Sequence, residues 1–241
     1  MIISHDHRLI FLKPQKVAGT SFEIALSRYL GPHDIVTPVV PEDEAVRRKA
    51  GYREAQNYTF TPRALLQQRK YKEIAKALLR RRMPRKYFHH IPASAVKRRV
   101  GEAVWNGYLK VSIVRNPWDI VVSKFYWDQG RDADIADLTR WSLANPAFFA
   151  FNRRMYLIDE TPVIDHFLRY EHFRDDILAL EETRPALAGL ADTLAGIKAK
   201  GASRKPGSRN LPAIYAAHPK VNALIEVFFD YEITRFSYTL D

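Results

Sequence analysis

The clearest structural signal in the chain is an apolar run that passes directly into a helix, Leu109-Lys110-Val111-Ser112-Ile113-Val114-Arg115-Asn116-Pro117-Trp118-Asp119. The residues before Arg115 have the length and character of a buried strand. Asn116 is a favourable N-cap, and Pro117 is favoured at the first helical position. This stretch therefore predicts a strand that is followed by a short polar turn and the N-terminus of a helix.

A second unit of the same kind lies near the start of the sequence. Residues 8–13 form a short apolar run that ends at Pro14 and leads into the small-residue turn Lys16-Val17-Ala18-Gly19-Thr20-Ser21. A helical pattern follows and stops at Gly31-Pro32. Residues 162–165 are a further strand candidate, before a helix from about residue 172. Strands that alternate with helices indicate an α/β fold on a parallel sheet.

The other segments carry weaker signals. We expect residues 32–60 to be mostly loop, because they contain Pro, Gly and polar residues with little periodicity. Thr61-Pro62 has the cap and first residue of a helix that should run to about Met83-Pro84. Residues 198–212 form a basic loop rich in Gly, Ser and Pro, and residues 222–230 predict a final helix.

Composition narrows the class of protein. The 241 residues suit one domain, and 46% hydrophobic residues with 27% charged ones indicate a globular protein with a sizeable core. The absence of cysteine excludes disulfide frameworks, zinc ribbons and thiol nucleophiles. A charged group interrupts the first apolar run, and no stretch approaches the roughly 18 apolar residues of a membrane span. We therefore expect a cytoplasmic, bacterial protein.

The net charge of +11 is concentrated in one segment. Residues 47–86 contain fourteen basic residues and only two acidic ones, so this window carries +12 and the rest of the chain −1. A local excess predicts a specific anionic partner, although a solvated helix face with no partner has the same composition. Nucleic acid, an anionic membrane surface, an acidic polysaccharide and a phosphorylated cofactor remain candidates at this point.

The turn from Lys16 to Ser21 suits an anionic ligand. Small residues at a strand-to-helix turn let backbone N–H groups approach a phosphate or sulfate, and the helix N-terminus adds positive potential. The turn is not a Walker A loop, G-x-x-x-x-G-K-[ST], because Lys16 begins the turn instead of preceding the hydroxyl residue at its end. A tight turn with small residues for packing is the alternative.

The second unit offers another anion-binding group. Arg115 ends its strand at the carboxyl edge of the sheet, where ligands of α/β proteins bind. Ser123 follows two helical turns later, and a guanidinium and a hydroxyl can hold one phosphate between them. Asp119 is an alternative partner for Arg115. Two anion-accepting strand ends indicate a ligand with two separated phosphates.

These motifs together resemble a known family. Residues 11–21 resemble the 5′-phosphosulfate loop of sulfotransferases that use 3′-phosphoadenosine 5′-phosphosulfate (PAPS). Residues 111–119, with Ser123, resemble the 3′-phosphate motif of that superfamily, and the Golgi-type carbohydrate sulfotransferases and their bacterial relatives are the most similar. Further similarity covers residues 88–95, 168–171 and 224–238. Gln15 stands where the family commonly has Pro, and Val17-Ala18 where Thr-Gly is commoner.

The resemblance implies a single domain with a P-loop-like, three-layer α/β fold and a basic helical insertion at about 41–86. It implies transfer of a sulfuryl group from PAPS to a carbohydrate hydroxyl, leaving adenosine 3′,5′-bisphosphate, with no metal. Lys16 and the N–H groups of Gly19, Thr20 and Ser21 would stabilise charge on the leaving phosphate. His90 is the first choice for the general base and His89 the second, since an imidazole suits that work near neutral pH.

Several alternatives stay open. The basic loop with Arg204, Lys205 and Arg209 could close over the 3′-phosphate or be a solvated linker. The basic segment could gather an anionic glycan or bring the enzyme to an anionic membrane that carries a lipid-linked sugar. A P-loop-like nucleotide or small-molecule kinase and a non-enzymatic polyanion-binding protein are the competing functions. No recognition-helix or RNA-binding motif favours nucleic acid as the partner.

Overall fold

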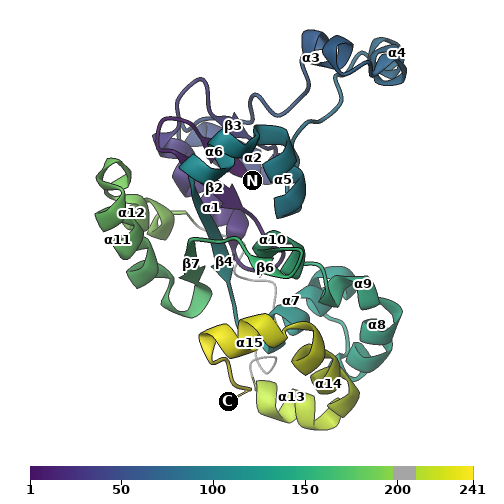
Figure 1. The fold of residues 1–241 in the computed structure, drawn as a ribbon. Helices are drawn as coiled ribbons and strands as arrows, with labels where there is room; N and C mark the ends of the chain where they lie inside the picture. The colour runs from purple at the N-terminus through teal and green to yellow at the C-terminus, as the bar shows by residue number, and fades with distance from the viewer. Residues whose placement is uncertain (198–209, 241) are drawn as a thin grey trace.

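A computed structural model describes residues 1–197 and 210–240 of the chain as an α/β protein built on a five-stranded sheet (Figure 1). The strand order is β3-β1-β2-β4-β7. Their bounds are β1 (Ile2–Ser4), β2 (Leu9–Leu12), β3 (Ile35–Val36), β4 (Leu109–Val114) and β7 (His166–Arg169). Strands β2, β4 and β7 are parallel, whereas β1 is antiparallel to both β2 and β3. The expected all-parallel sheet is therefore wrong at one edge, where a β1–β2 hairpin and β3 make the sheet mixed.

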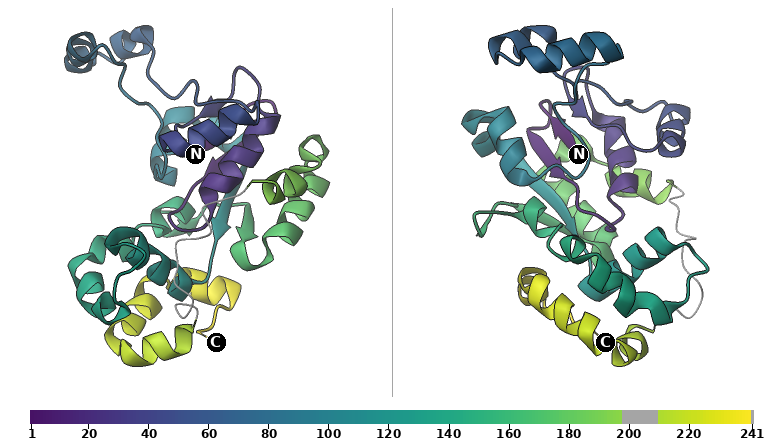
Figure 2. Two further views of the ribbon diagram at one scale, coloured as in Figure 1. Left: turned by 180° about the vertical axis from the view of Figure 1, so that it is seen from behind. Right: turned by 90° about the vertical axis from the view of Figure 1, so that its right-hand side faces the viewer.

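Helices cover both faces of the sheet, as the views in Figure 2 show. Along β2 the side chains alternate: Leu9 and Phe11 join one core, and Ile10 and Leu12 join the other. The first core includes residues of α1 (Gly19–Leu26), α7 (Pro117–Gln129), α11 (Phe173–Thr183) and α12 (Leu190–Ala195). The second includes residues of α5 (Ala93–Val100), α6 (Glu102–Gly107) and α10 (Arg153–Tyr156). A sheet buried on both sides explains why β2 reads as a continuous apolar run.

Both strand–turn–helix units predicted from the sequence are present. The first consists of β2 and α1, which continues as the 3-10 turn η1 (Ser27–Tyr29), and the second of β4 and α7. The Asn116 side chain accepts hydrogen bonds from the N–H groups of Trp118 and Asp119, at 3.0 and 3.4 Å. The N-cap prediction is therefore confirmed.

The third predicted strand is displaced. Residues 161–162 form β6 (Thr161–Pro162), which pairs with β5 (Leu157–Ile158) in a separate two-stranded hairpin. The strand that completes the main sheet is β7, a few residues later, and the 3-10 turn η3 (Tyr170–His172) leads from it to α11. Both segments are short, so the local pattern cannot distinguish the hairpin strand from the sheet strand.

Residues 32–83 contain more regular structure than expected. The segment predicted to be mostly loop holds β3 and the helix α2 (Pro41–Lys49). The single helix predicted from Thr61 is two helices, α3 (Pro62–Gln67) and α4 (Tyr71–Arg80). Arg69 separates them with a φ of 53°, in the left-handed region that commonly ends a helix. The cap is as predicted, because Thr61 Oγ1 accepts from Ala64 N at 3.2 Å.

The remaining helices complete the second half of the fold. They are η2 (Ile135–Asp137), α8 (Leu138–Ala144), α9 (Pro146–Phe149), η4 (Pro185–Leu187), α13 (Leu211–Ala217), α14 (Pro219–Phe228) and α15 (Asp230–Phe236). The helix predicted over residues 222–230 corresponds to α14, but it is not the final helix, because α15 follows after Phe229. The Trp118 indole donates to Asn222 at 2.6 Å, and the Tyr215 hydroxyl donates to the Trp118 carbonyl at 2.7 Å. These bonds fasten the C-terminal helices to α7. Among the described residues, no helix is both long and apolar enough to span a bilayer.

The placement of β7 in the main sheet can be tested by stability. Leu168 on β7 is fully buried, whereas Leu143 on α8 is 57% exposed. We expect Leu168→Ala to lower the free energy of unfolding by about 2–5 kcal/mol, because it leaves a cavity in the core. The matched Leu143→Ala variant should change it by less than about 0.5 kcal/mol. Urea unfolding of both variants checks this, and equal small effects would contradict the placement.

Candidate functional site

The two predicted motifs lie side by side at one edge of the sheet. Strands β2 and β4 are parallel, with Leu12 opposite Ser112, and the Ser112 hydroxyl donates to the Leu12 carbonyl at 2.8 Å. Both strands end at the carboxyl edge of the sheet. Strand β2 continues into the turn of residues 13–18, and β4 continues into Arg115 and the start of α7. Parallel pairing therefore brings together residues about 100 positions apart.

Three side chains hold the carbonyl groups of the turn of residues 13–18. The His90 ring bonds to the Lys13 carbonyl through Nδ1 at 2.9 Å, and Arg115 Nη1 donates to the Lys16 carbonyl at 2.9 Å. The buried Asn152 donates to the Gln15 carbonyl at 3.1 Å and accepts from the Gln15 N–H at 2.8 Å. The turn is thus fixed from three directions, by side chains from three separate parts of the chain.

The same turn leaves a run of N–H donors without acceptors. Lys16 and Ala18 have positive φ values of 62° and 60°, and turns of this kind direct successive N–H groups toward a bound anion in other proteins. The N–H groups of residues 17–20 donate to no acceptor among the described residues. No side chain caps α1, and its first turn contains no acidic residue. The N–H group of Ser21 was predicted to bind the anion, but it already donates to the Ala18 carbonyl at 3.1 Å. Ser21 can therefore donate to a ligand through its hydroxyl instead.

A buried ion pair stabilises the turn of residues 13–18. The Lys13 ammonium lies 2.5 Å from the Glu23 carboxylate on α1 and donates to the Thr20 hydroxyl at 2.9 Å. Lys13 is 6% exposed and Glu23 is fully buried, and burial lowers the pKa of Lys13. A Cβ on Gly19 would lie 2.9 Å from Cγ of Lys13, so the lysine stem fills the space that the glycine leaves. The position therefore requires glycine for close packing.

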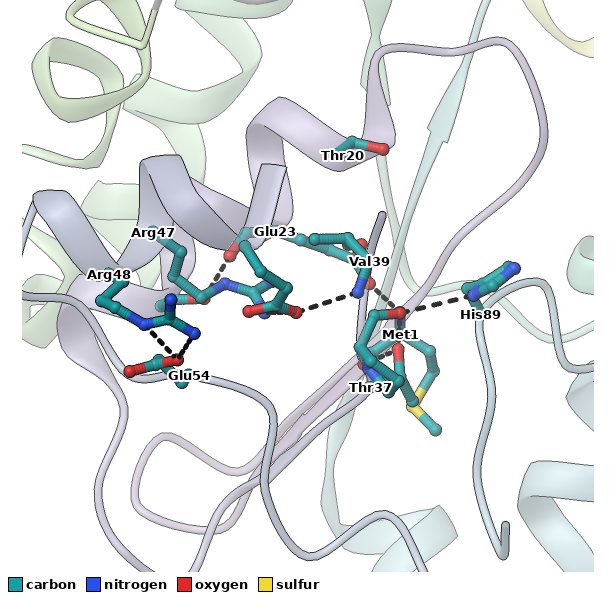
Figure 3. A network of polar contacts seen from close by, with 12 residues as sticks. Met1, Thr20, Glu23, Thr37, Val39, Arg47, Arg48, Glu54 and His89 are labelled. Carbon is teal, nitrogen blue, oxygen red and sulfur yellow. Dashed lines mark hydrogen bonds and ion pairs between the residues drawn. The ribbon is translucent and has the colours of Figure 1, made fainter. Parts of the chain in front are cut away.

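This ion pair belongs to a larger buried network, drawn in Figure 3. The Met1 amino group donates to Glu23 and, at 2.9 Å, to the Thr37 hydroxyl. On α2, the fully buried Arg47 pairs with Glu44 at 2.8 Å. The sequence analysis missed these roles. A signal was present, since Lys13 and Glu23 are opposite charges that each adjoin residues predicted to be buried.

Arg115 is held in a defined position beside the turn. Besides its bond to Lys16, it forms an ion pair with Asp119 and lies over the ring of Tyr170, 4.1 Å from the ring centre. The predicted alternative partner, Asp119, is therefore present. Among the described residues these bonds use three of the five N–H donors of the guanidinium, which leaves two for a ligand.

The remaining residues of the two predicted motifs are placed less tightly. The Lys16 ammonium lies 4.3 Å from the ring centre of Trp127, a residue of α7 that is 58% exposed and that the sequence analysis did not single out. Val17 is buried, and Ser123 is half-buried on α7. The Ser123 hydroxyl forms no hydrogen bond to another described residue, so the structure does not join it to Arg115 directly.

The two candidate histidines have different surroundings. The His90 ring lies against the turn, and because a carbonyl only accepts, Nδ1 must carry the proton and Nε2 the lone pair. Burial lowers the pKa of His90 to about 3, so the ring is neutral at physiological pH. His89 is exposed, its Nδ1 lies 3.4 Å from the Pro38 carbonyl, and its ring centre lies 5.1 Å from that of His90. Partial loss of contact with water and the charge of Lys13 also lower the pKa of His89.

The geometry of the β4–α7 turn depends on the C-terminal tail. One Glu171 oxygen accepts from the Asn116 N–H at 2.8 Å, and the other accepts from the Tyr238 hydroxyl at 2.9 Å. The Asn116 side chain donates to the Thr239 carbonyl at 2.8 Å. Glu171 therefore ties the tail to the turn that carries Arg115.

Some predictions cannot be placed on this site. Arg204, Lys205 and Arg209 lie outside the described residues. Within residues 1–197 and 210–240, no group of three or more His, Asp or Glu side chains is arranged to hold a metal ion.

Comparison with known proteins gives no family assignment. No protein-family model, curated protein or solved structure matches the chain.

The pKa of His90 predicts how stability depends on pH. The folded-state pKa lies near 3, below the ordinary value of about 6.5, so the unfolded chain binds a proton at this histidine between those values and the folded chain does not. Falling pH then favours the unfolded state. We expect wild type to lose stability relative to His90→Asn as the pH falls from about 6.5 to 3, by at most about 1.4 kcal/mol per pH unit.

Urea unfolding across this pH range measures the difference. The Asn side chain can still donate to the Lys13 carbonyl, so the variant removes the titration and keeps the hydrogen bond. The His33→Asn variant makes the same replacement at an exposed position and is the matched control. A flat difference for His90→Asn would contradict a buried, neutral His90.

Proposed function

We propose that this protein is a PAPS-dependent sulfotransferase that moves a sulfuryl group to a hydroxyl of a carbohydrate acceptor. One contact carries the proposal: Arg115 donates to the Lys16 carbonyl at 2.9 Å, which unites the two anion-binding strand ends. A ligand with two separate phosphate groups would meet both ends at once. The sequence resemblance assigns the same two motifs to the 5′ and 3′ sides of PAPS.

The donors at the site fit this cofactor. Free N–H groups at residues 17–20 and the ammonium of Lys16 suit the 5′-phosphosulfate, because they present several positive dipoles and one charge to an anion. The two remaining N–H donors of Arg115, with the hydroxyl of Ser123, suit the 3′-phosphate. When bound, the cofactor supplies an activated sulfuryl group.

The protein's part in the reaction is electrostatic stabilisation and proton transfer. The N–H groups of residues 17–20, in a turn that His90, Arg115 and Asn152 hold, would stabilise negative charge on a leaving phosphate. Donors that need no rearrangement stabilise such charge most effectively. Lys16 adds a full positive charge, and its stacking on Trp127 keeps it near the start of the turn.

His90 is the residue best placed to act as general base. Its Nδ1 proton is committed to the Lys13 carbonyl, so Nε2 is free to accept the proton of an acceptor hydroxyl. A neutral ring with a low pKa is a weak base, but a bound anionic cofactor raises the pKa by stabilising the protonated form. His89 contacts Pro38 instead, which favours His90 over His89.

Ligand binding tests the proposal against its competitors. We expect adenosine 3′,5′-bisphosphate to raise the thermal unfolding midpoint, because at a hundredfold excess over Kd it adds about 2.7 kcal/mol to the free energy of unfolding. ADP and 5′-AMP should raise the midpoint much less. Differential scanning fluorimetry measures the shift. An equal or larger shift with ADP and magnesium would instead support the kinase alternative, and no shift with any nucleotide would support polyanion binding.

Two variants show whether the expected groups cause the shift. Arg115→Ala should abolish most of the effect of adenosine 3′,5′-bisphosphate, because it removes the charge expected to face the 3′-phosphate. Arg63→Ala removes the same charge from a distant exposed position and is the matched control. A full shift in Arg115→Ala, or an equal loss in both variants, would contradict the proposed site.

A further inference from the structure

A helical arm stands apart from the body of the protein in all three views (Figures 1 and 2). The arm consists of residues 61–83, which contain α3 and α4. Two paired segments form its neck: Phe60 N donates to the Pro84 carbonyl at 3.0 Å, and Lys86 N donates to the Tyr58 carbonyl at 2.8 Å. The neck fixes the base of the arm to the body while the helices project away from it.

The arm exposes large apolar side chains that a water-facing helix pair normally buries. The exposed fractions are 57% for Leu66, 63% for Tyr71, 76% for Leu78 and 85% for Leu79. None of the residues of α4 is buried. A groove of about 280 Å³ lies between the two helices and is lined mostly by apolar side chains, including Leu66, Leu78 and Ile74. This face of the arm is built to contact something apolar.

The side of α4 opposite Ile74 and Leu78 is basic, and Leu79 lies at its border. Lys72, Lys76 and Arg80 follow one another at the four-residue spacing that places side chains on one side of a helix. Residues 62–86 contain ten basic residues and one acidic residue, Glu73, a net charge of +9. In the described part of the chain, only Lys76 among these ten forms an ion pair, at 3.1 Å with Glu73. The arm therefore combines an exposed apolar face with a large uncompensated positive charge.

We propose that the arm binds the surface of an anionic lipid bilayer. The side chains of Leu78 and Leu79 would enter the boundary between headgroups and acyl chains, and the basic residues would lie among anionic headgroups, as in interfacial amphipathic helices. Charge decides against a second copy of the chain, because residues 62–86 carry +9 in each copy and the two copies would repel each other. An acidic polysaccharide would use the charge but leave the apolar face in water.

Membrane binding would also place the candidate site near the bilayer. His90 is the tenth residue after Arg80, the end of α4, and a chain of that length spans at most about 35 Å. Membrane binding by the arm does not depend on whether the protein catalyses sulfuryl transfer. The arm can therefore bind a membrane whether or not the sulfotransferase proposal holds.

Vesicle sedimentation of the full chain tests the arm. We expect binding to vesicles of phosphatidylcholine with a quarter phosphatidylserine, little binding to phosphatidylcholine alone, and weaker binding as salt is raised. Leu78→Glu with Leu79→Glu should reduce binding at least tenfold. The matched control is Leu143→Glu with Val227→Glu, which makes the same change at residues 57% and 68% exposed elsewhere, and it should retain most of the binding.

Four results would overturn the proposal. The first is no binding to phosphatidylserine vesicles at low salt, and the second is full binding by the Leu78→Glu, Leu79→Glu variant. The third is an equal loss of binding in the Leu143→Glu, Val227→Glu control. The fourth is a concentration-dependent dimer, seen by sedimentation velocity without vesicles, that the Leu78→Glu, Leu79→Glu variant no longer forms. The second result would leave charge alone as the cause and favour a soluble polyanion, and the fourth would show a second copy as the partner. None of them bears on nucleotide binding, which the thermal shifts measure separately.

Discussion

The ion pair between Lys13 and Glu23 is the interaction on which the rest of the site depends. Both side chains lie in the interior, where an unpaired charge is costly, so each requires the other to stay in place. Lys13 also holds Thr20 and packs against Gly19, so the pair fixes the end of β2 to the start of α1. The turn between them is then held at a constant distance from both elements, and its backbone N–H groups are arranged before any ligand arrives.

The other parts of the site attach to that turn. His90, Asn152 and Arg115 each bond to one of its carbonyl groups, so a base candidate, a structural clamp and a cation are positioned by the same short segment. Parallel pairing of β2 with β4 places Arg115 at the required edge, and Glu171 secures the turn that carries it. The hydrogen bonds from these side chains to backbone carbonyl groups therefore fix the three side chains relative to one another.

The sequence predicted the local features of the fold well because local signals determine them. The apolar run of β4 and the cap at Asn116 act within a few residues, and both are confirmed. Contacts between distant segments were missed: β1 and β3 are too short to show a period, and their pairing with β2 is tertiary. The break at Arg69 was missed because the apolar and basic spacing continues through it. Charged residues are usually exposed, so the sequence did not predict the burial of Lys13 and Glu23.

The most direct test of the two-phosphate site is a crystal structure of the complex with adenosine 3′,5′-bisphosphate. The site predicts one phosphate within hydrogen-bond distance of the N–H groups of residues 17–20 and the other on Arg115 and Ser123. His90 should keep its bond to the Lys13 carbonyl, with Nε2 facing open space beside the first phosphate. A bisphosphate bound elsewhere, or one that reaches only one of the two strand ends, would contradict the central claim.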